Sequence, residues 1–407
     1  MSKEQSRLDD VVKTGRETLC GRYLRNFWQP IYRSQDLKRG RAVPVEILSE
    51  KFTLYRGESG SPHIVAFKCA HRGTQLSTGW VEGEDIRCRY HGWKYDACGQ
   101  CVEQPSESIS FASKVRIRSW PAQDYLGLIW GYFGEKETPS FRRFADLEGE
   151  GLLIANPPEM WPCNYFNRLE NDSAHPPFTH RESLRRVGRQ LKPGGSITAE
   201  EMEYGVRFTR AGRQTYTYFF MPNLVELGRE PGTIETRVPG AGKTTAYPNV
   251  RLLIYVPIND GRCVTFPIDY LEIDGSEATA YREQCNDFMA KVDTARLNKL
   301  AESVLAGETS IEDLDANLST FDLFWIEDYV TAVGQGAFAD RNQERLGQSD
   351  KGVILIRKLF DRELSALAKG AQLTPWCDPP KGLTDEKAPL REVHKQASPD
   401  YIPGGIS

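Results

Sequence analysis

Cys69-Ala70-His71-Arg72-Gly73 and Cys88-Arg89-Tyr90-His91-Gly92-Trp93 are the two segments that decide the fold, and 16 residues separate His71 from Cys88. Each segment supplies one cysteine and one histidine, followed by a glycine. Glycine allows a loop to fold tightly, so that backbone N–H groups can approach a bound group. The pattern therefore predicts a metal site built from two short loops.

The order of these ligands distinguishes between two kinds of metal site. Zinc fingers usually pair two cysteines in one half and two histidines in the other. In a Rieske [2Fe–2S] cluster two cysteines hold one iron and two histidines hold the other, so each loop can give one of each. We predict that Cys69, His71, Cys88 and His91 bind such a cluster, with a structural zinc ion as the alternative.

A second histidine cluster lies further along the chain. His175 and His180 are separated by a segment that begins Pro176-Pro177, and Asp172 precedes them. The prolines favour a turn into a new helix, which can bring both imidazoles to one point. Two histidines and one carboxylate leave positions open on Fe(II), as oxygen activation requires. His175 and His180 are thus candidate ligands of a mononuclear iron.

The overall composition excludes several classes of function. The chain has 407 residues, with 52 basic and 56 acidic side chains and a net charge of −4, which gives no reason to expect nucleic-acid binding. The start, MSKEQSRLDD, has no apolar signal segment, and apolar runs such as 252–256 are too short to span a bilayer. We expect a cytoplasmic protein that binds neither nucleic acid nor membrane.

The order of elements along the chain predicts an α+β fold. Short apolar runs broken by Gly, Asp and Pro indicate a small all-β domain, and strand patterns followed by helices at 278–304 and 321–333 indicate a larger mixed domain. The last helix keeps one apolar face from Val353 to Leu367, and Gly370 can end it.

Four parts are expected. They are an N-terminal helical segment that packs on the catalytic domain, a small Rieske domain, a helix-grip-like catalytic domain with an antiparallel sheet, and an extended tail: residues 1–40, 41–150, 151–373 and 374–407.

With its two histidine clusters the chain resembles the terminal oxygenase α subunits of Rieske ring-hydroxylating oxygenases. The stretch from Asn164 to His180 is similar to the iron-binding segment of that family, and Glu344 to Val353 and Arg25 to Pro30 resemble its phthalate dioxygenase and O-demethylase branch. The interval between Glu170-Asn171 and Asp172 is shorter than is usual in the family.

This resemblance implies roles for further residues. Asp172 accepts hydrogen bonds from the iron ligand His175 and from His91 of a neighbouring subunit, and so links the two metal sites. Phe324 to Tyr329 resembles the family's late helix that carries the third iron ligand. Asp328 is the expected ligand, and Glu327 is the alternative.

The implied function is that of a terminal oxygenase. It uses O₂ and electrons from a separate NAD(P)H-dependent reductase, with or without a ferredoxin, to hydroxylate or oxidatively demethylate an organic substrate. The family expectation is an aromatic, often carboxylated compound, and a homotrimer or a multiple of it without a β subunit. The alternative is a Rieske-type electron carrier or redox sensor with a degenerate catalytic domain.

A run of basic residues follows the second histidine cluster. It is either a solvated helix face or a docking surface for an acidic partner, and it consists of Arg181, Arg185, Arg186 and Arg189.

Overall fold

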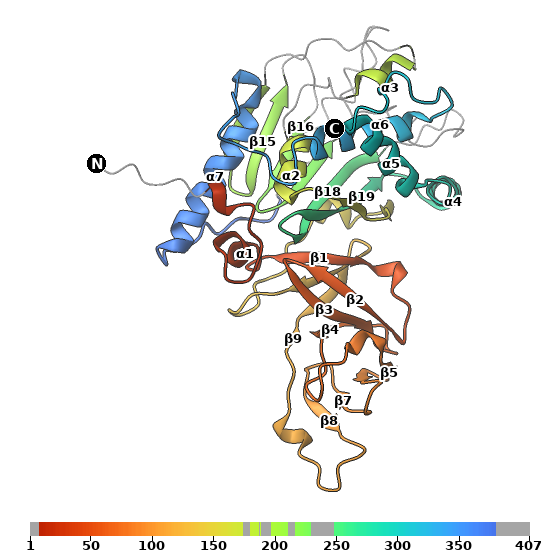
Figure 1. Cartoon of the computed structure of the whole chain (residues 1–407), viewed down its shortest axis with the longest axis vertical. Coiled ribbons are helices and arrows are strands. Elements are labelled where there is room, and N and C mark those ends of the chain that lie inside the picture. The colour runs from red at the N-terminus through yellow and green to blue at the C-terminus, as the bar shows by residue number, and fades with distance from the viewer. Residues whose placement is uncertain are drawn as a thin grey trace. The chain divides into compact units, whose positions relative to one another are not determined.

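The computed structural model describes residues 8–173, 180–186, 188, 197–210, 216–228 and 248–379. The chain forms two compact units (Figure 1). The smaller unit comprises Asp9–Arg142 and Val256–Asp260, and the larger unit comprises the rest. The small β domain and the larger mixed domain agree with the predicted α+β class.

The smaller unit is built from short antiparallel strands in three sheets. One sheet has the order β1-β11-β10, the second β2-β3-β4-β9 and the third β5-β6-β7-β8. The bounds are β1 Trp28–Arg33, β2 Arg41–Ile47, β3 Glu50–Arg56, β4 Pro62–Ala66, β5 Trp80–Glu82, β6 Asp85–Arg87, β7 Lys94–Tyr95, β8 Cys101–Glu103, β9 Ser119–Trp120, β10 Ala122–Tyr125 and β11 Leu128–Tyr132.

The N-terminal segment differs from the prediction of a helical part packed on the catalytic domain. Helix α1 (Leu19–Leu24) is short, and β1 begins soon after it. Residues 9–40 belong to the smaller unit. Trp28 pairs with Tyr132 in the β1–β11 ladder, and the Thr14 N–H donates to Asp260 at 2.7 Å. Ladder hydrogen bonds to a distant strand override the local helical tendency, which is a weak preference.

A large antiparallel sheet forms the centre of the larger unit. Its order is β12-β19-β18-β17-β16-β15-β14, and β13 also pairs with β19. The strands are β12 Leu152–Ala155, β13 Glu159–Trp161, β14 Ile197–Met202, β15 Gly205–Arg210, β16 Tyr216–Phe220, β17 Leu224–Gly228, β18 Pro248–Asn259 and β19 Arg262–Leu271. The strand patterns predicted for the larger domain form this sheet, and the apolar run 252–256 lies within β18.

The helices of the larger unit lie beside this sheet (Figure 1). They are α2 Tyr165–Ser173, α3 Arg181–Arg186, α4 Gly275–Met289, α5 Thr294–Leu305, α6 Thr320–Val333 and α7 Lys351–Ala368. The single helix predicted over 278–304 is two helices, because the chain breaks after Met289 and Asp293 caps a new start by accepting from the Arg296 N–H at 2.9 Å.

Helix α7 matches its predicted pattern. Ile356, Phe360 and Leu364 are fully buried on one face, and Gly370 follows the helix with φ +65°. Within the described ranges, no helix combines the length and the apolar character that crossing a membrane requires. The predicted tail lies outside the described residues from position 380 onward.

Candidate metal centres

The two Cys–His segments form loops with the same hydrogen-bond pattern. In each, the cysteine N–H donates to the carbonyl five residues later at 2.8 Å, and the glycine N–H donates back to the cysteine carbonyl at 3.0 Å. Gly73 and Gly92 have φ of +73° and +74°, in the left-handed region that favours glycine. The loops therefore place Cys69 and Cys88 in equivalent positions.

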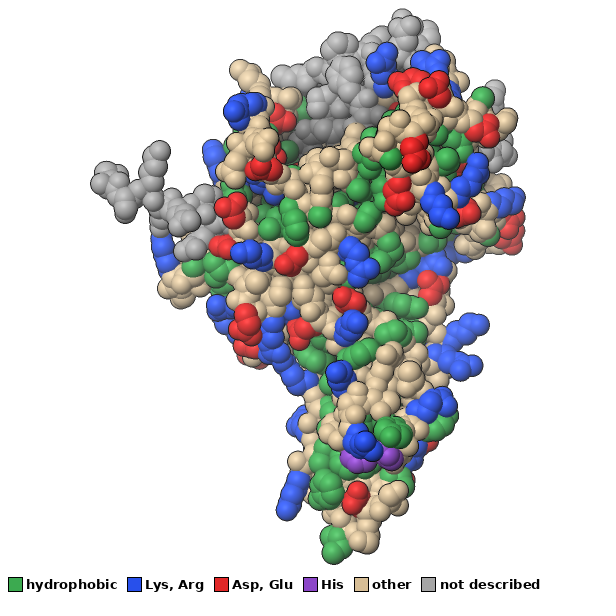
Figure 2. All heavy atoms as spheres, viewed as in Figure 1, with side chains coloured by type: hydrophobic (Ala, Val, Ile, Leu, Met, Phe, Trp, Pro, Cys, Tyr) green, Lys and Arg blue, Asp and Glu red, His purple; other side chains and the backbone are tan. Residues whose placement is uncertain are grey.

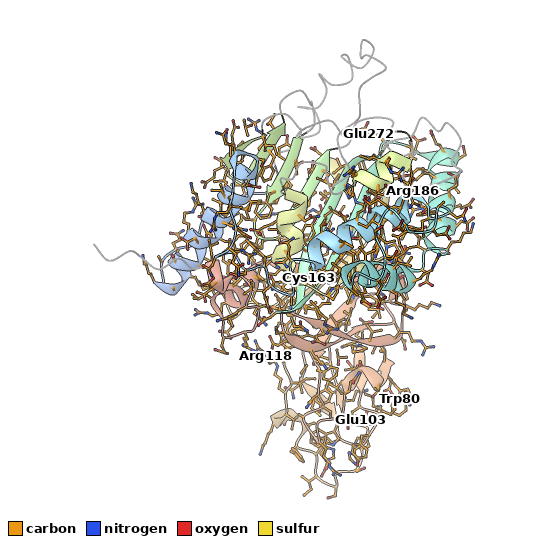
Figure 3. All side chains as sticks on the ribbon, turned by 45° about the horizontal axis from the view of Figure 1, so that its top comes forward. Trp80, Glu103, Arg118, Cys163, Arg186 and Glu272 are labelled. Carbon is orange, nitrogen blue, oxygen red and sulfur yellow. The ribbon has the colours of Figure 1, made fainter. Side chains whose placement is uncertain are left out.

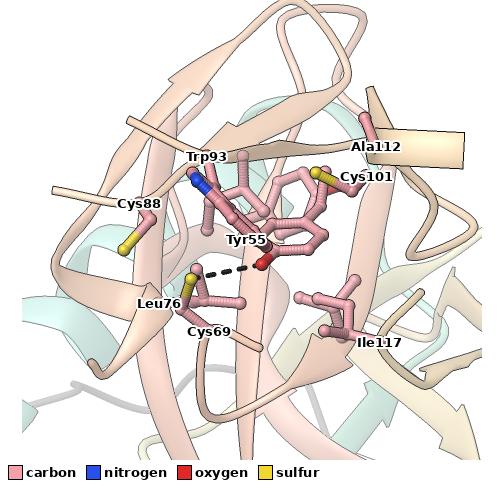
Figure 4. Packing of buried hydrophobic residues seen from close by; sticks show 11 residues of the cluster. Tyr55, Cys69, Leu76, Cys88, Trp93, Cys101, Ala112 and Ile117 are labelled. Atoms are coloured by element: carbon pink, nitrogen blue, oxygen red, sulfur yellow. Dashed lines mark hydrogen bonds between the residues drawn. The ribbon is translucent and has the colours of Figure 1, made fainter. Parts of the chain in front are cut away.

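Both cysteine side chains are buried at the edge of the aromatic core (Figure 4). Cys69 is 3% exposed and Cys88 is 2% exposed. Burial raises the pKa of the Cys69 thiol, and the neighbouring Cys88 adds to this. The Tyr95 hydroxyl lies 3.2 Å from Cys69 Sγ and accepts the Ala70 N–H, also at 3.2 Å. Tyr95 thus has its own proton free for the sulfur.

The two histidine rings are also paired. The centroids of His71 and His91 are 4.6 Å apart. Trp93 stacks on His71 at 4.6 Å with an interplanar angle of 6°, and Tyr90 stacks on His91 at 3.8 Å. Aromatic contacts thus restrict the orientation of both imidazoles.

These four side chains fit a two-iron cluster. The His71 Nδ1 is buried and has no hydrogen-bond partner, which is unusual for a polar atom and is what a metal ligand requires. In the described part of the chain, no three His, Cys, Asp or Glu side chains are grouped to hold a single metal ion. A [2Fe–2S] cluster instead takes two protein ligands at each iron, so a pair of thiols and a pair of imidazoles suffice.

Aromatic and basic side chains surround the two histidines. Arg72 lies over the Tyr90 ring at 5.5 Å, and Arg89 lies over the Trp80 ring at 4.3 Å. Tyr90 and Trp80 are 55% and 45% exposed. Figure 2 shows histidine side chains at the surface beside hydrophobic and basic groups.

The second candidate site is in the larger unit. His180 is 1% exposed and lies just before α3, and its Nε2 is 3.0 Å from Oδ1 of Asp328 on α6. Phe324, one turn earlier on α6, packs edge-on against the His180 ring at 4.5 Å. Two ligands about 2.1 Å from one ion lie about 3 Å apart when they are adjacent. The spacing of these two atoms therefore fits a shared metal ion.

Glu327 has a different role from its neighbour. Its carboxylate accepts the Glu182 N–H at 2.8 Å and the Ser183 hydroxyl at 2.6 Å, so it caps the start of α3. Burial raises the pKa of Glu327, although these hydrogen bonds oppose the shift. Of the two candidates for the third ligand, only Asp328 contacts His180 in the described residues.

Two residues of the basic run after His180, Arg185 and Arg186, form contacts within the protein, and Arg189 lies outside the described residues. Arg185 and Arg186 both donate to Glu182, and the Arg185 hydrogen bond is the main reason that the pKa of Glu182 falls to about 2. Arg186, which is labelled in Figure 3, also donates to the carbonyls of Leu314 and Asp315 at 2.9 and 2.8 Å. Arg186 therefore anchors α3 and is not an open docking residue.

The remaining predicted residues belong to α2 and the segment after it. Asp172 lies in the last turn of α2, and His175 lies outside the described residues. The contact of Tyr95 with Cys69 was not anticipated from the sequence. The sequence signal that could have indicated this contact is Tyr95 itself, an aromatic residue two positions after Trp93 of the second loop.

Comparison with known proteins gives the family. The model of the Rieske [2Fe-2S] domain matches residues 27–121. The chain is 38% identical to the phenoxybenzoate dioxygenase subunit alpha of Ectopseudomonas oleovorans, over 87% of this chain and 83% of that protein. It is 27% identical to the 5,5'-dehydrodivanillate O-demethylase oxygenase subunit of Sphingobium sp. (strain NBRC 103272 / SYK-6), over 98% of this chain and 88% of that protein.

Among solved structures, the fold is similar to the terminal oxygenase of carbazole 1,9a-dioxygenase from Novosphingobium sp. KA1. The TM-score is 0.63 at 18% identity, covering 92% of this chain and 96% of that one. The paired loop ligands, the two-part fold and the extent of these matches lead to one conclusion: the chain belongs to the Rieske ring-hydroxylating oxygenases as an α subunit, the terminal oxygenase of a multicomponent system.

Proposed function

We propose that this terminal oxygenase binds a mononuclear ferrous iron through His175, His180 and Asp328. The supporting observation is the 3.0 Å approach of His180 Nε2 to Asp328 Oδ1, which joins residues 148 positions apart. When both groups are bound, a Rieske cluster stores single electrons and a ferrous iron activates dioxygen. The chain's own contribution is to hold the ligands and to keep the iron site shielded from water by residues such as Phe324.

Asp172 has a connecting role in this proposal. It accepts hydrogen bonds from His175 and from His91 of a neighbouring subunit, in a homotrimer or a multiple of it without a β subunit. A carboxylate between two imidazoles orients both rings. Electrons are supplied by a separate NAD(P)H-dependent reductase, directly or through a ferredoxin.

The proposed substrate is an aromatic compound with a carboxylate or ether group. The names of the two relatives above specify phenoxybenzoate and dehydrodivanillate, which both combine these features. The proposed reaction is hydroxylation or oxidative demethylation. A screen of such compounds with a surrogate reductase, following O₂ uptake and product mass, identifies which of them is oxidised.

Iron analysis of matched variants tests the iron site. We expect about three irons per chain in the wild type, since the cluster accounts for two. Asp328→Ala should retain the cluster spectrum and lose the third iron, because one ligand is removed. Glu327→Gln should retain all three irons and lose stability, because it caps α3. Two irons in the wild type, or a third iron that survives Asp328→Ala, contradicts the proposal; the former result favours an electron carrier.

A further inference from the structure

One polar face of α2 is bound along its length to the segment that follows α6. Asn164 directly precedes α2, and the side chains of Asn167 and Glu170, three residues apart, lie near one another on the helix surface. The Asn164 N–H donates to the Ala337 carbonyl at 2.9 Å, and Asn167 Nδ2 donates to the Gly336 carbonyl at 3.1 Å. This face thus fixes α2 against the chain just beyond the helix that carries Asp328.

Glu170 makes the strongest contacts on this face. Its carboxylate pairs in a two-point arrangement with Arg357 of α7, with Nε–Oε1 at 2.5 Å and Nη2–Oε2 at 2.9 Å. Arg341 Nη2 lies 3.3 Å from the same Oε2. Arg357 in turn donates to Glu344, with Nη2–Oε1 at 3.1 Å. Two-point arginine–carboxylate pairs are directional and restrict the position of both partners.

The network is buried and balanced in charge. The side chains of Glu170, Arg357 and Arg341 are 10%, 9% and 11% exposed. Two acids, Glu170 and Glu344, face two arginines. A buried pair is weak evidence for stability by itself, but the removal of one partner leaves an uncompensated charge. The loss of Glu170 therefore disturbs the position of the elements that it joins.

Two of these elements adjoin, along the chain, residues of the proposed iron site. Glu170 lies two residues before Asp172, in the last turn of α2, and the segment 336–344 follows α6, which carries Asp328. Positions 170 and 172 are about 200° apart around a helix axis. The face held by the arginines is therefore opposite to the face on which position 172 lies.

We propose that Glu170, through Arg357 and Arg341, is a positioning residue that sets the rotation and axial placement of α2 and hence the geometry of the iron site. This inference rests on the proposed function. It gives Glu170 a role that does not involve contact with iron or substrate.

A second buried glutamate on α7 provides a matched control. Glu363 is 1% exposed, and its carboxylate accepts the Thr374 N–H at 3.1 Å. It lies six residues after Arg357, and within the described chain its carboxylate is hydrogen-bonded to Thr374 and Arg362 and not to α2. Glu363→Gln should therefore lower stability without altering the placement of α2.

The test measures how fast a ferrous chelator removes the mononuclear iron from the reconstituted holoenzyme. The Rieske absorbance is followed in parallel, together with the melting temperature. We expect about tenfold faster release from Glu170→Gln, the scale typical of residues that support metal ligands. Arg357→Lys should behave similarly, because lysine keeps the charge but cannot make the two-point contact. Arg341→Lys should show a smaller effect, since its contact with Glu170 is longer.

The outcomes separate the two proposals. If Glu170→Gln and Arg357→Lys release iron at the wild-type rate, and the wild type holds three irons per chain, the positioning role is overturned and the proposed function stands. Equal acceleration in Glu363→Gln at a similar loss of melting temperature also overturns it, because general destabilisation then explains the effect. Two irons in the wild type refutes the proposed function and this inference together. If Glu170→Gln does not fold, the charge-conserving Arg357→Lys decides the question by the same criteria.

Discussion

Tyr95 shows how one residue modifies the chemistry of the loop ligands. Hydrogen bonds to the cluster sulfurs are one of the factors that set the potential of an iron–sulfur cluster. The structure adds one such bond, from the Tyr95 hydroxyl to Cys69 Sγ at 3.2 Å. A donor to sulfur stabilises the reduced cluster, which carries more negative charge, and so raises the potential.

Tyr95→Phe should lower the midpoint potential of the cluster. A hydrogen bond worth about 1 kcal/mol corresponds to about 40 mV for one electron. Tyr55→Phe is the matched control, since Tyr55 is buried in the same core but donates to the Glu84 carbonyl at 2.9 Å. A redox titration followed by visible absorbance measures both. Equal potentials in Tyr95→Phe and the wild type would show that the hydroxyl does not act on the sulfur.

At the scale of elements, the ligand loops depend on backbone conformations that only glycine adopts easily. Gly73 and Gly92 have nearly the same positive φ, but their surroundings differ. A Cβ at position 92 lies 3.1 Å from Pro105 Cγ, whereas at position 73 the nearest atom is Lys68 Cδ at 4.0 Å. The second loop is therefore the more constrained one.

Replacing each of these glycines with alanine distinguishes the effect of backbone strain from that of steric contact with Pro105. Gly73→Ala should reduce the free energy of unfolding by about 1 kcal/mol, because alanine is strained at positive φ. Gly92→Ala should cost more and release the cluster faster, because Pro105 must also move. Thermal melting and the decay of the Rieske absorbance check both. A larger loss of melting temperature in Gly73→Ala than in Gly92→Ala would show that the second loop is not the more constrained one.

The strands of the smaller unit are also joined by a carboxylate whose titration sets a pH dependence. Asp124 on β10 accepts from Arg56 of β3 at 2.7 Å and from the Ser34 hydroxyl at 2.5 Å. Burial opposes its ionisation, but these hydrogen bonds outweigh burial and hold the pKa of Asp124 below the usual 3.8. A lowered pKa in the folded state stabilises the fold above pH 3.8, and this contribution is lost as the pH falls through the folded-state pKa.

Asp124→Asn should therefore be less stable than the wild type at pH 7, by about 1 kcal/mol. The difference should narrow as the pH falls below 3.8, because the carboxyl of the unfolded chain then binds a proton while that of the folded protein still resists protonation. Melting temperatures of both proteins, measured from pH 7 down to about pH 2.5, follow this difference. A difference in melting temperature that stays constant over this pH range would mean that the charge of Asp124 does not contribute to stability.

At the scale of the whole molecule, the proposed path between the metal sites joins two chains. His91 belongs to the smaller unit, and Asp172 and Asp328 belong to the larger one. If the path runs between subunits, a defect in one unit of a chain can be complemented by an intact unit of its neighbour. Closed head-to-tail rings have this property, because each interface pairs different surfaces.

Mixed assemblies test this directly. His91→Ala should impair the cluster and Asp328→Ala the iron site, so each variant alone should be inactive. Co-expressed with different affinity tags and purified through both, the mixed oligomer should regain a measurable part of the wild-type O₂ uptake and product formation. If the doubly tagged oligomer forms but has no activity, the path lies within one chain.

The sequence by itself identified the candidate cluster ligands, because each loop is short and local. Cys69 and His71 share one turn, and so do Cys88 and His91, so ligand order and glycine positions are visible without a fold. The amphipathic face of α7 was equally visible. The break between α4 and α5 and the pairing of residues 28–33 with a strand a hundred positions later were not, because tertiary contacts override weak local preferences.

Only the tertiary structure distinguishes the surroundings of Asp328 from those of Glu327. Adjacent residues on a helix point about 100° apart, so the packing of α6 against α3 directs one carboxylate to His180 and the other to the N–H groups of α3. The same holds for Glu170, whose arginine partners lie more than 170 positions away. Contacts between distant segments depend on how elements pack, and a sequence pattern read over a few turns does not contain that information.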